Sequence, residues 1–201
     1  MTAARGDLVS RLETALARPV TGKGSSDFDL LAGALPRPST PLREAAVLLA
    51  IDPEREDLIL TRRAAMLRNH PGQIALPGGR REATDLSLAS TALREAEEEV
   101  GLPRAAVRVL GLLDLHETVS GFKIQPVVGV LEQPVTLRAD PSEVAEIFRV
   151  PLGLLLDPSQ YRLERRRIGP KEAQYFVVPH GPYYIWGATA RILRSLALKD
   201  L

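Results

Sequence analysis

The chain has 201 residues, of which 45% are hydrophobic and 25% charged, and these proportions and this length suit an ordinary globular protein with one buried core. Lys and Arg number 26 against 25 Asp and Glu, so the charge gives no support to nucleic acid or a membrane as the main partner. The sequence has no cysteine, which excludes disulfides, thiolate metal sites and a cysteine nucleophile.

The N-terminus is polar and lacks the apolar core of a signal peptide. No run approaches the roughly 18 apolar residues that are needed to span a bilayer. We therefore expect a soluble, cytoplasmic protein. The sequence leaves the oligomeric state open, with a homodimer as one option.

The first 40 residues are expected to form an N-terminal helix and an arm. Apolar residues at helical spacing predict a helix over Gly6–Arg18, which Pro19 ends. The segment Val20–Pro41 is rich in Gly, Ser and Pro, and it predicts a loop or arm and not a buried element. Residues 41–201 are then the main domain, with a C-terminal helix.

Strands dominate the first part of the main domain. The continuous apolar run Ala45–Ile51 predicts a strand covered on both faces, and a turn leads into Leu58–Thr61 as the second arm of a hairpin. Pro126 predicts an edge position or a bulge in its strand. The other predicted strands are Gln73–Leu76, Val107–Leu113, Ile124–Leu131, Tyr161–Arg167 and Ala173–Val178.

Three helices are predicted in the main domain. The strongest is Asp85–Val100, which Gly101 ends. A short helix is predicted over Ser142–Phe148 with Ser142 as its N-cap, and an amphipathic helix over Tyr183–Leu198. Strands and helices mix without strict alternation, which favours an α/β fold with a mixed sheet.

The helix that ends at Val100 carries a cluster of glutamates. At about 100° per residue, Glu95, Glu98 and Glu99 share one arc, whereas Glu97 lies about 160° from Glu95. A separate apolar face gathers Leu86, Ala89, Leu93, Ala96 and Val100. A solvated surface helix is the ordinary interpretation, because glutamate is a good helix former.

Two features favour a metal site instead. Like charges at these spacings repel by a few tenths of a kcal/mol per pair, and only Arg94 lies nearby to offset them. A divalent cation reverses that repulsion, and oxygen ligands suit Mg²⁺ or Mn²⁺. The second feature is the loop Gly78-Gly79, where the backbone comes close to another group or adopts positive φ.

These residues resemble the box of the Nudix hydrolases: a Gly, five residues, a Glu, seven residues, then Arg-Glu-apolar-x-Glu-Glu-x-Gly-apolar. Gly79 fits its start, and Arg94–Leu102 fits its end without a mismatch. Asp85 stands where the first Glu is expected, and eight residues separate it from Arg94, so no role is assigned to Asp85. The resemblance implies a Nudix-like α/β/α sandwich with a mixed β-sheet.

Several further segments resemble the coenzyme A diphosphatase branch of that family. Together they extend the resemblance from about Ala45 to Leu198. The matching segments are Leu60–Arg63, His70–Gln73, Pro77–Gly79, Thr118–Phe122 with the following Pro126, Ser142–Val144 and Tyr184–Thr189.

The resemblance implies a role for each residue of the box. Glu95, Glu98 and Glu99 hold one or more Mg²⁺ or Mn²⁺ ions that bridge to a diphosphate, and the metal supplies positioned water and charge neutralisation. Arg94 orients one of these carboxylates. The glycines of the Gly78-Gly79 loop let the backbone approach the site.

Other roles follow from the softer segments. Arg63, Arg68, His70 and Gln73 are implied substrate contacts, and arginine suits phosphate because of its bidentate fork. Glu143 is either the general base or a surface residue. For the run Arg165-Arg166-Arg167, a solvated strand end is favoured over a contact with the 3′-phosphate of coenzyme A. For Trp186 and its neighbours, core packing is favoured over adenine stacking.

Three functions remain open at this point. The leading hypothesis is metal-dependent hydrolysis of coenzyme A or acyl-coenzyme A to 3′,5′-ADP and a 4′-phosphopantetheine fragment. The second is a broader hydrolase of ADP-ribose, dinucleotides or dNTPs. The third is a binding module with the Nudix fold and no catalysis.

Overall fold

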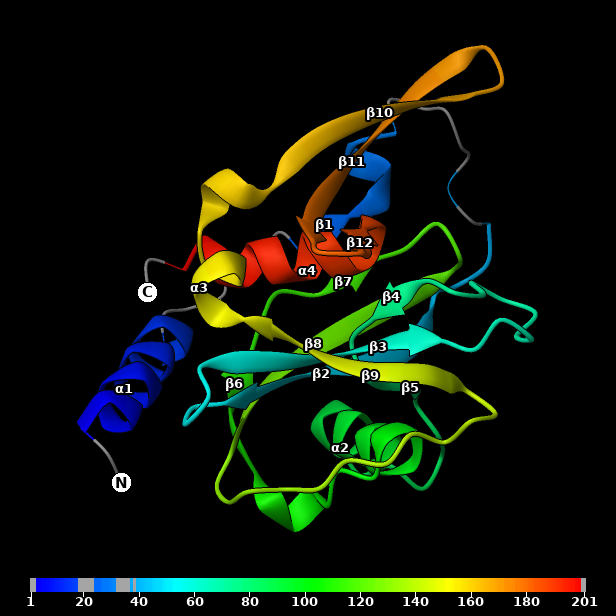
Figure 1. The fold of residues 1–201 in the computed structure, drawn as a ribbon. Helices are drawn as coiled ribbons and strands as arrows, with labels where there is room; N and C mark the ends of the chain where they lie inside the picture. The colour runs from blue at the N-terminus through cyan, green and yellow to red at the C-terminus, as the bar shows by residue number, and fades with distance from the viewer. Residues whose placement is uncertain (1–2, 18–23, 32–36, 38, 200–201) are drawn as a thin grey trace.

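The computed structural model describes residues 3–17, 24–31, 37 and 39–199, and Figure 1 shows its arrangement. The helices are α1 Ala3–Ala17, α2 Leu88–Val100, α3 Leu152–Leu155 and α4 Gly187–Ala197, with short 3₁₀ turns η1 Asp27–Asp29, η2 Arg104–Ala106 and η3 Pro158–Gln160. The large sheet contains β1 Ser25–Ser26, β2 Arg43–Asp52, β3 Asp57–Arg63, β4 Ile74–Ala75, β5 Gly78–Arg80, β6 Val107–Leu112, β7 His116–Glu117, β8 Phe122–Leu131 and β9 Val144–Pro151. A smaller sheet contains β10 Arg162–Ile168, β11 Lys171–His180 and β12 Tyr183–Trp186.

The central strand β2 supplies side chains to two cores. Leu48 and Ala50 are buried in the cluster formed with α2, whereas Leu49 and Ile51 are buried in the cluster that includes α1 and α4. Side chains alternate in this way because successive residues of a strand point to opposite faces. Strand β2 pairs in parallel with β8 and antiparallel with β3, so the sheet is mixed. Figure 1 shows α2 and α4 on opposite faces, and the predicted α/β/α sandwich is confirmed.

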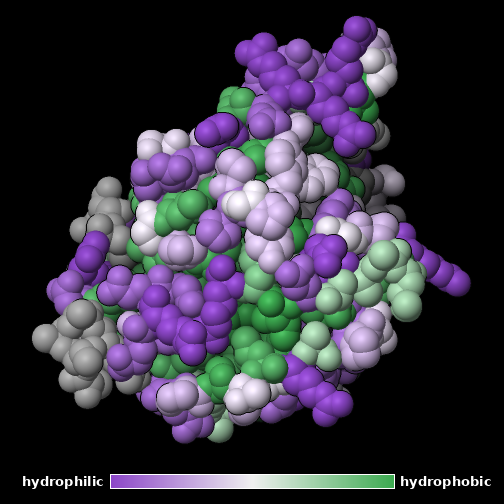
Figure 2. Space-filling view, in the orientation of Figure 1, coloured by the Kyte–Doolittle hydropathy of each residue, from purple (hydrophilic) through white to green (hydrophobic). Residues whose placement is uncertain are grey.

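Most of the predicted strands are present. The hairpin of β2 and β3 closes at Asp52 opposite Asp57, and β10 pairs antiparallel with β11 along its whole length. That second pair projects from the body of the molecule, and Figure 2 shows hydrophilic side chains over its tip. Strand β10 exposes the three arginines Arg165, Arg166 and Arg167, and Arg165 forms an ion pair with Glu172. Their exposure agrees with the solvated strand end that the sequence favoured.

The helix predicted over Ser142–Phe148 is wrong. Residues from Val144 onward form β9, which pairs antiparallel with β3. The aromatic and β-branched residues of this segment suit a strand, and the ion pair between Arg62 and Glu146 joins the two strands. Ser142 is not an N-cap; instead its N–H and hydroxyl both donate to Asp140 in a turn.

The helix predicted over Tyr183–Leu198 begins later than its apolar pattern indicated. Its first four residues form β12, which pairs with β11, and α4 begins at Gly187. Gly187 has a φ of 64°, a conformation that glycine adopts without strain, and it marks the change from strand to helix. Trp186 therefore ends a strand and does not open a helix.

Pro126 does not lie at an edge, because β8 pairs with β2 on one side and with β6 and β7 on the other. The proline stands where β7 gives way to β6. Its missing N–H is replaced by Gln125, whose Nε2 donates to the carbonyl of Leu113 at 2.8 Å. A side-chain amide thus keeps the ladder satisfied across an interior proline.

The loop predicted over Val20–Pro41 contains two short elements among its described residues. Strand β1 pairs in parallel with β7, and Ser26 is buried at its end. Ser26 and Asp29 form a capping box around η1. The Ser26 hydroxyl accepts from a backbone N–H of the turn, and the Asp29 carboxylate accepts from the N–H of Ser26. Such pairing between distant segments leaves no local pattern, so the composition alone predicted an arm. Pro19 lies outside the described residues.

Helix α1 confirms the prediction for Gly6–Ala17 and packs against the main core. Val9 and Leu12 are buried in the same cluster as Leu49 and Leu193. Across the described ranges, no helix is long and apolar enough to cross a membrane.

We expect Leu12→Ala to lower the free energy of unfolding by about 3 kcal/mol, because it leaves a cavity at a fully buried position. Arg11→Ala, at an exposed position of the same helix, is the matched control and should change it by less than about 0.5 kcal/mol. Urea denaturation measures both. Equal effects would show that α1 is an appended arm that does not belong to the core.

Candidate active site

Helix α2 is fixed at both ends. Ser87 and Ser90 form a capping box at its N-terminus, and Gly101 closes its C-terminus in the left-handed conformation, donating to the carbonyls of Ala96 and Glu97. The predicted end of the helix is confirmed. Its predicted start at Asp85 is wrong: the helix begins at Leu88. Leu86 is 95% exposed and takes no part in the apolar face.

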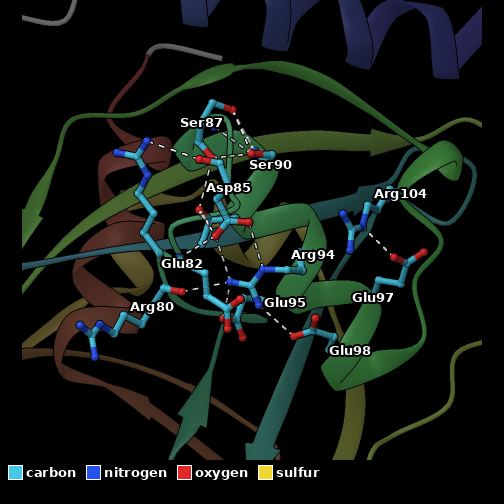
Figure 3. Close-up of polar contacts among 12 residues, drawn as sticks. Arg80, Glu82, Asp85, Ser87, Ser90, Arg94, Glu95, Glu97, Glu98 and Arg104 are labelled. Carbon is cyan, nitrogen blue, oxygen red and sulfur yellow. Dashed lines mark hydrogen bonds and ion pairs between the residues drawn. The ribbon is translucent and has the colours of Figure 1, made fainter.

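Arg94 is the centre of the polar network around α2, as Figure 3 shows. Its Nε and Nη2 donate to the two oxygens of Asp85 at 3.0 and 3.1 Å. Nη1 donates to Glu98 at 2.9 Å, and Nη2 also donates to the carbonyl of Arg80 at 3.0 Å. Nη2 lies 3.0 Å from Glu95 Oε1. The guanidinium therefore ties α2 to the loop that precedes it.

Asp85 has a structural role that the box alignment did not assign. Besides Arg94, its carboxylate accepts from the Glu82 N–H and the Thr91 hydroxyl. The hydrogen bonds from Arg94 hold the pKa of Asp85 far below its usual range, and the bond to Asp85 raises the pKa of Arg94. The turn before Ser87 accommodates the extra residue, so Asp85 still reaches Arg94.

The Gly78-Gly79 loop contacts the two inner carboxylates. A Cβ on Gly79 would lie 2.5 Å from the carboxylate of Glu95, so only glycine permits this approach. The N–H of Gly78 donates to Glu99 Oε2 at 3.1 Å. Gly78 has a φ of 154°, and a Cβ there would lie 2.3 Å from the carbonyl of Ala46, so the strand pairing of β5 with β2 also requires glycine.

The predicted arc of glutamates divides into two environments. The side chains of Glu95 and Glu99 are 15% and 5% exposed and face the glycine loop, whereas that of Glu98 is 56% exposed and contacts Arg94. Glu97 lies away from the site and pairs with Arg104 at 2.7 Å, which agrees with its exclusion from the arc.

Glu95 and Glu99, the two inner carboxylates, have too little positive charge nearby to offset their burial. Burial raises the pKa of Glu99 to about 7, although the N–H of Gly78 and the charge of Arg63 act in the opposite direction. Burial also raises the pKa of Glu95, against the effect of Arg94. The charge of Glu143 raises both values. Close, buried carboxylate oxygens of this kind suit a hard divalent ion.

The donor set fits such an ion in its chemistry but is not closed. Across residues 3–17, 24–31, 37 and 39–199, no three His, Asp or Glu side chains are already grouped as a metal site. Mg²⁺ typically takes one or two carboxylates and completes its shell with water and substrate phosphates, so Glu95 and Glu99 are sufficient as the protein's inner ligands.

Arg63 lies at the end of β3, next to Glu99. Its Nη1 is 3.8 Å from Glu99 Oε1, and its buried Nε has no hydrogen-bond partner in the described part of the chain. Glu143 is exposed in the loop before β9, and its carbonyl accepts from the N–H of Ala64 at 2.8 Å. This bond joins the Glu143 loop to the segment that follows Arg63.

A cavity of about 350 Å³ opens beside the glycine loop. Arg63, His70 and Gln73 line it, as predicted for substrate contacts, whereas Arg68 is exposed on the same loop and is not part of the lining. His70 has a φ of 56°, which turns the chain at the rim. The rest of the lining includes Thr118, Val119, Ser120, Phe122, Trp186, Gly187, Ala188 and Thr189.

The sequence around this site matches a known protein family. The model of the NUDIX domain matches residues 41–171, more than half of the chain. The chain belongs to the Nudix hydrolase family. Two relatives carry the name "Uncharacterized Nudix hydrolase NudL": the protein from Enterobacter sp. is 40% identical, and that from Cronobacter sakazakii 42%, each over 176 residues. Each match covers 87% of this chain and 91% of the relative.

Solved Nudix structures are also similar. The Nudix hydrolase RenU from M. smegmatis is 25% identical with a TM-score of 0.46, covering 56% of this chain and 72% of its own. The MutT protein from Methanosarcina mazei Go1 is 24% identical with a TM-score of 0.48, covering 60% and 84%. Family membership supports hydrolysis of a diphosphate as the reaction, and Nudix hydrolases generally use divalent ions such as Mg²⁺ or Mn²⁺.

We expect Gly79→Ala to reduce the hydrolysis of a diphosphate substrate about 100-fold, because the new methyl group displaces the Glu95 carboxylate by an ångström or more. The unfolding free energy should change little, since that carboxylate ends a flexible side chain. Gly153→Ala is the control, because a Cβ there meets no atom within 4 Å. Initial rates and thermal denaturation are compared for both. An active Gly79→Ala protein would contradict the assigned approach.

Asp85→Asn should destabilise the protein by about 3 kcal/mol at pH 7, since it removes the buried partner of Arg94. The pKa of Asp85 is lowered on folding, so its stabilisation is complete above the unfolded-state pKa near 4 and is lost as the pH falls towards the folded-state value. The difference from wild type should therefore be constant between about pH 5 and 7 and shrink below about pH 4. Glu97→Gln, on the exposed pair with Arg104, should cost less than about 1 kcal/mol.

Proposed function

We propose that the protein cleaves coenzyme A and its thioesters at the diphosphate, giving 3′,5′-ADP and a 4′-phosphopantetheine fragment. One observation supports this substrate above all. Four segments that resemble the coenzyme A diphosphatase branch, spread over more than one hundred residues of the chain, contribute to the lining of the same cavity: Leu60–Arg63 through Arg63, His70–Gln73, Thr118–Phe122 and Trp186–Thr189.

The inner carboxylates would hold the metal of this reaction. We assign Glu95 and Glu99 as its inner ligands and Glu98 as a further one, with Mg²⁺ or Mn²⁺ as the ion. Bound there, the ion supplies neutralisation of phosphate charge and an activated water. Arg94 is a positioning residue, because it contacts Glu95 and Glu98 and is itself held by Asp85.

The remaining roles belong to the rim of the cavity. Arg63 offers its Nε to a phosphate oxygen, and the backbone of Gly78-Gly79 lets the diphosphate approach Glu95 and Glu99. Glu143 is our choice for the general base, since its charge acts on both inner carboxylates and its loop is joined to the Arg63 segment. His70 and Gln73 line the cavity as substrate contacts. Arg68 lies outside that lining, and its proposed role is a contact with phosphate from the outer edge of the site.

Incubation with coenzyme A and Mn²⁺ should yield 3′,5′-ADP, separated and quantified by chromatography. We expect Glu99→Gln to lower kcat at least 100-fold, because the inner carboxylate next to Gly78 is lost. Glu97→Gln is the matched control on the same helix and should retain full activity, since Glu97 faces Arg104 and not the site.

A substrate panel separates coenzyme A from nucleotides in general. If ADP-ribose, dinucleotides or dNTPs are cleaved faster than coenzyme A, the enzyme is a broader diphosphate hydrolase. If Glu99→Gln matches wild type while 3′,5′-ADP still forms, the activity comes from a contaminant and the chain is a binding module. Absence of 3′,5′-ADP at high enzyme concentration rejects the proposed substrate.

A further inference from the structure

A second compartment adjoins the cavity of the site. It has a volume of about 220 Å³ and lies between η1, the β10–β11 pair and the start of α4. Asp27, Val119, Trp186 and Gly187 line both spaces, so the two compartments share one wall. Figure 1 shows β1, β11 and β12 near one another above α4.

The wall of the second compartment is mostly apolar. Trp186 packs edge-to-face against Tyr175, with 5.5 Å between ring centroids. The other apolar lining residues are Leu30, Leu31, Ile168, Ala173 and Phe176. Such a wall recognises an uncharged apolar group by burying it.

The charges around this compartment do not suit an additional phosphate. Asp27 stands at the shared wall as a carboxylate that accepts from His116 Nε2 at 3.1 Å and from the N–H of Val119 at 3.1 Å. Arg191 is neutralised by Asp29 at 2.9 Å. Arg166 lines the compartment from an exposed position, where a long side chain keeps its charge in water. Asp27 would repel an anion at the shared wall.

Segments outside the matched NUDIX domain build most of this compartment. The domain match covers residues 41–171, whereas Asp27, Leu31, Ala173, Tyr175 and Trp186 all lie beyond it. Asp27 is held in place by His116, which is fully buried and also contacts the hydroxyl of Ser25 at 2.8 Å. The fold thus adds a rigid apolar compartment to the domain that carries the chemistry.

We propose that this second compartment binds the acyl chain of a coenzyme A thioester. The inference rests on the proposed function, because it names the substrate class for the same site. The diphosphate lies at the glycine loop, the pantetheine arm follows the first cavity, and the acyl chain enters the second. Asp27 at the junction accepts a hydrogen bond from an N–H or O–H of the arm. Free coenzyme A leaves the compartment empty.

Trp186 is the single tryptophan of the chain and lines both spaces. Its emission is followed while the protein is titrated with the two halves of the substrate, hexanoyl-4′-phosphopantetheine and 3′,5′-ADP, and with 4′-phosphopantetheine, which lacks the acyl chain. We expect the acyl half to shift the emission to shorter wavelength than 4′-phosphopantetheine does, and 3′,5′-ADP to leave it unchanged. If 3′,5′-ADP quenches Trp186, or if the acyl half has no effect beyond that of 4′-phosphopantetheine, the proposal is wrong.

Ala173→Leu fills the compartment, since Ala173 lines it and is buried on β11. Glu172→Leu adds the same residue at the neighbouring exposed position and is the control. In wild type, kcat/KM for acyl-coenzyme A should rise about fourfold for each methylene of the acyl chain that enters the compartment. Ala173→Leu should remove that gain, while free coenzyme A is cleaved at the wild-type rate. Thermal denaturation of both variants checks folding. Ala173→Val fills less of the same space and serves in place of Ala173→Leu if that variant does not fold; it should remove part of the gain.

The outcomes separate the two proposals. Equal kcat/KM for acetyl and hexanoyl thioesters, with coenzyme A still cleaved, rejects the acyl compartment and leaves the proposed function standing. A response of Trp186 to the acyl half without any hydrolysis of coenzyme A rejects the proposed function and supports acyl binding. A tenfold rise in KM of Arg166→Met for coenzyme A, absent for dephospho-coenzyme A, places the 3′-phosphate there and overturns the acyl assignment.

Discussion

The buried guanidinium of Arg94 is the constraint on which the candidate site depends. A buried charge is stable only when partners compensate for the lost water, and Arg94 finds them in Asp85, Glu98 and the carbonyl of Arg80. These partners come from the helix and from the loop before it, so satisfying one cation fixes their relative position. The close approach of Gly79 to Glu95 depends on that position. The geometry of the carboxylates on α2 is therefore set by the hydrogen bonds and ion pairs of Arg94.

The network around Arg94 does not supply enough positive charge to offset the burial of Glu95 and Glu99. Arg94 is held foremost by Asp85, whose pKa it lowers, and it only partly offsets the burial of Glu95. Glu99 has the more distant Arg63 and one backbone N–H, and its pKa stays raised. Two neighbouring carboxylates that are under-compensated in this way bind a divalent ion more readily than a pair that is already neutralised, because the ion relieves both burial and repulsion.

Local periodicity was enough to predict α2, its glutamate arc and the exclusion of Glu97, because each depends only on the geometry of one helix. It did not predict β9, since Val144–Pro151 becomes a strand through pairing with β3, about eighty residues earlier. Nor did it assign Asp85, whose role arises from a turn that lets an aspartate reach an arginine nine residues away. Asp27 left little signal, because its place depends on the parallel pairing of β1 with β7. An acidic residue beside a Ser cap in a polar arm was the one local clue.

The site and its surroundings obey different constraints. The inner carboxylates, Arg94 and the glycine loop lie on α2 and β5 against the central strand β2, which fixes the distances between them. Part of the cavity wall lies outside this frame, in the N-terminal segment, the small sheet and α4. A change of side chain in these walls alters the shape and charge that a substrate meets without moving Glu95 or Glu99. Selectivity can therefore change in the added segments while the diphosphate chemistry is preserved, which is why the substrate of this chain is best sought in residues that the family box does not contain.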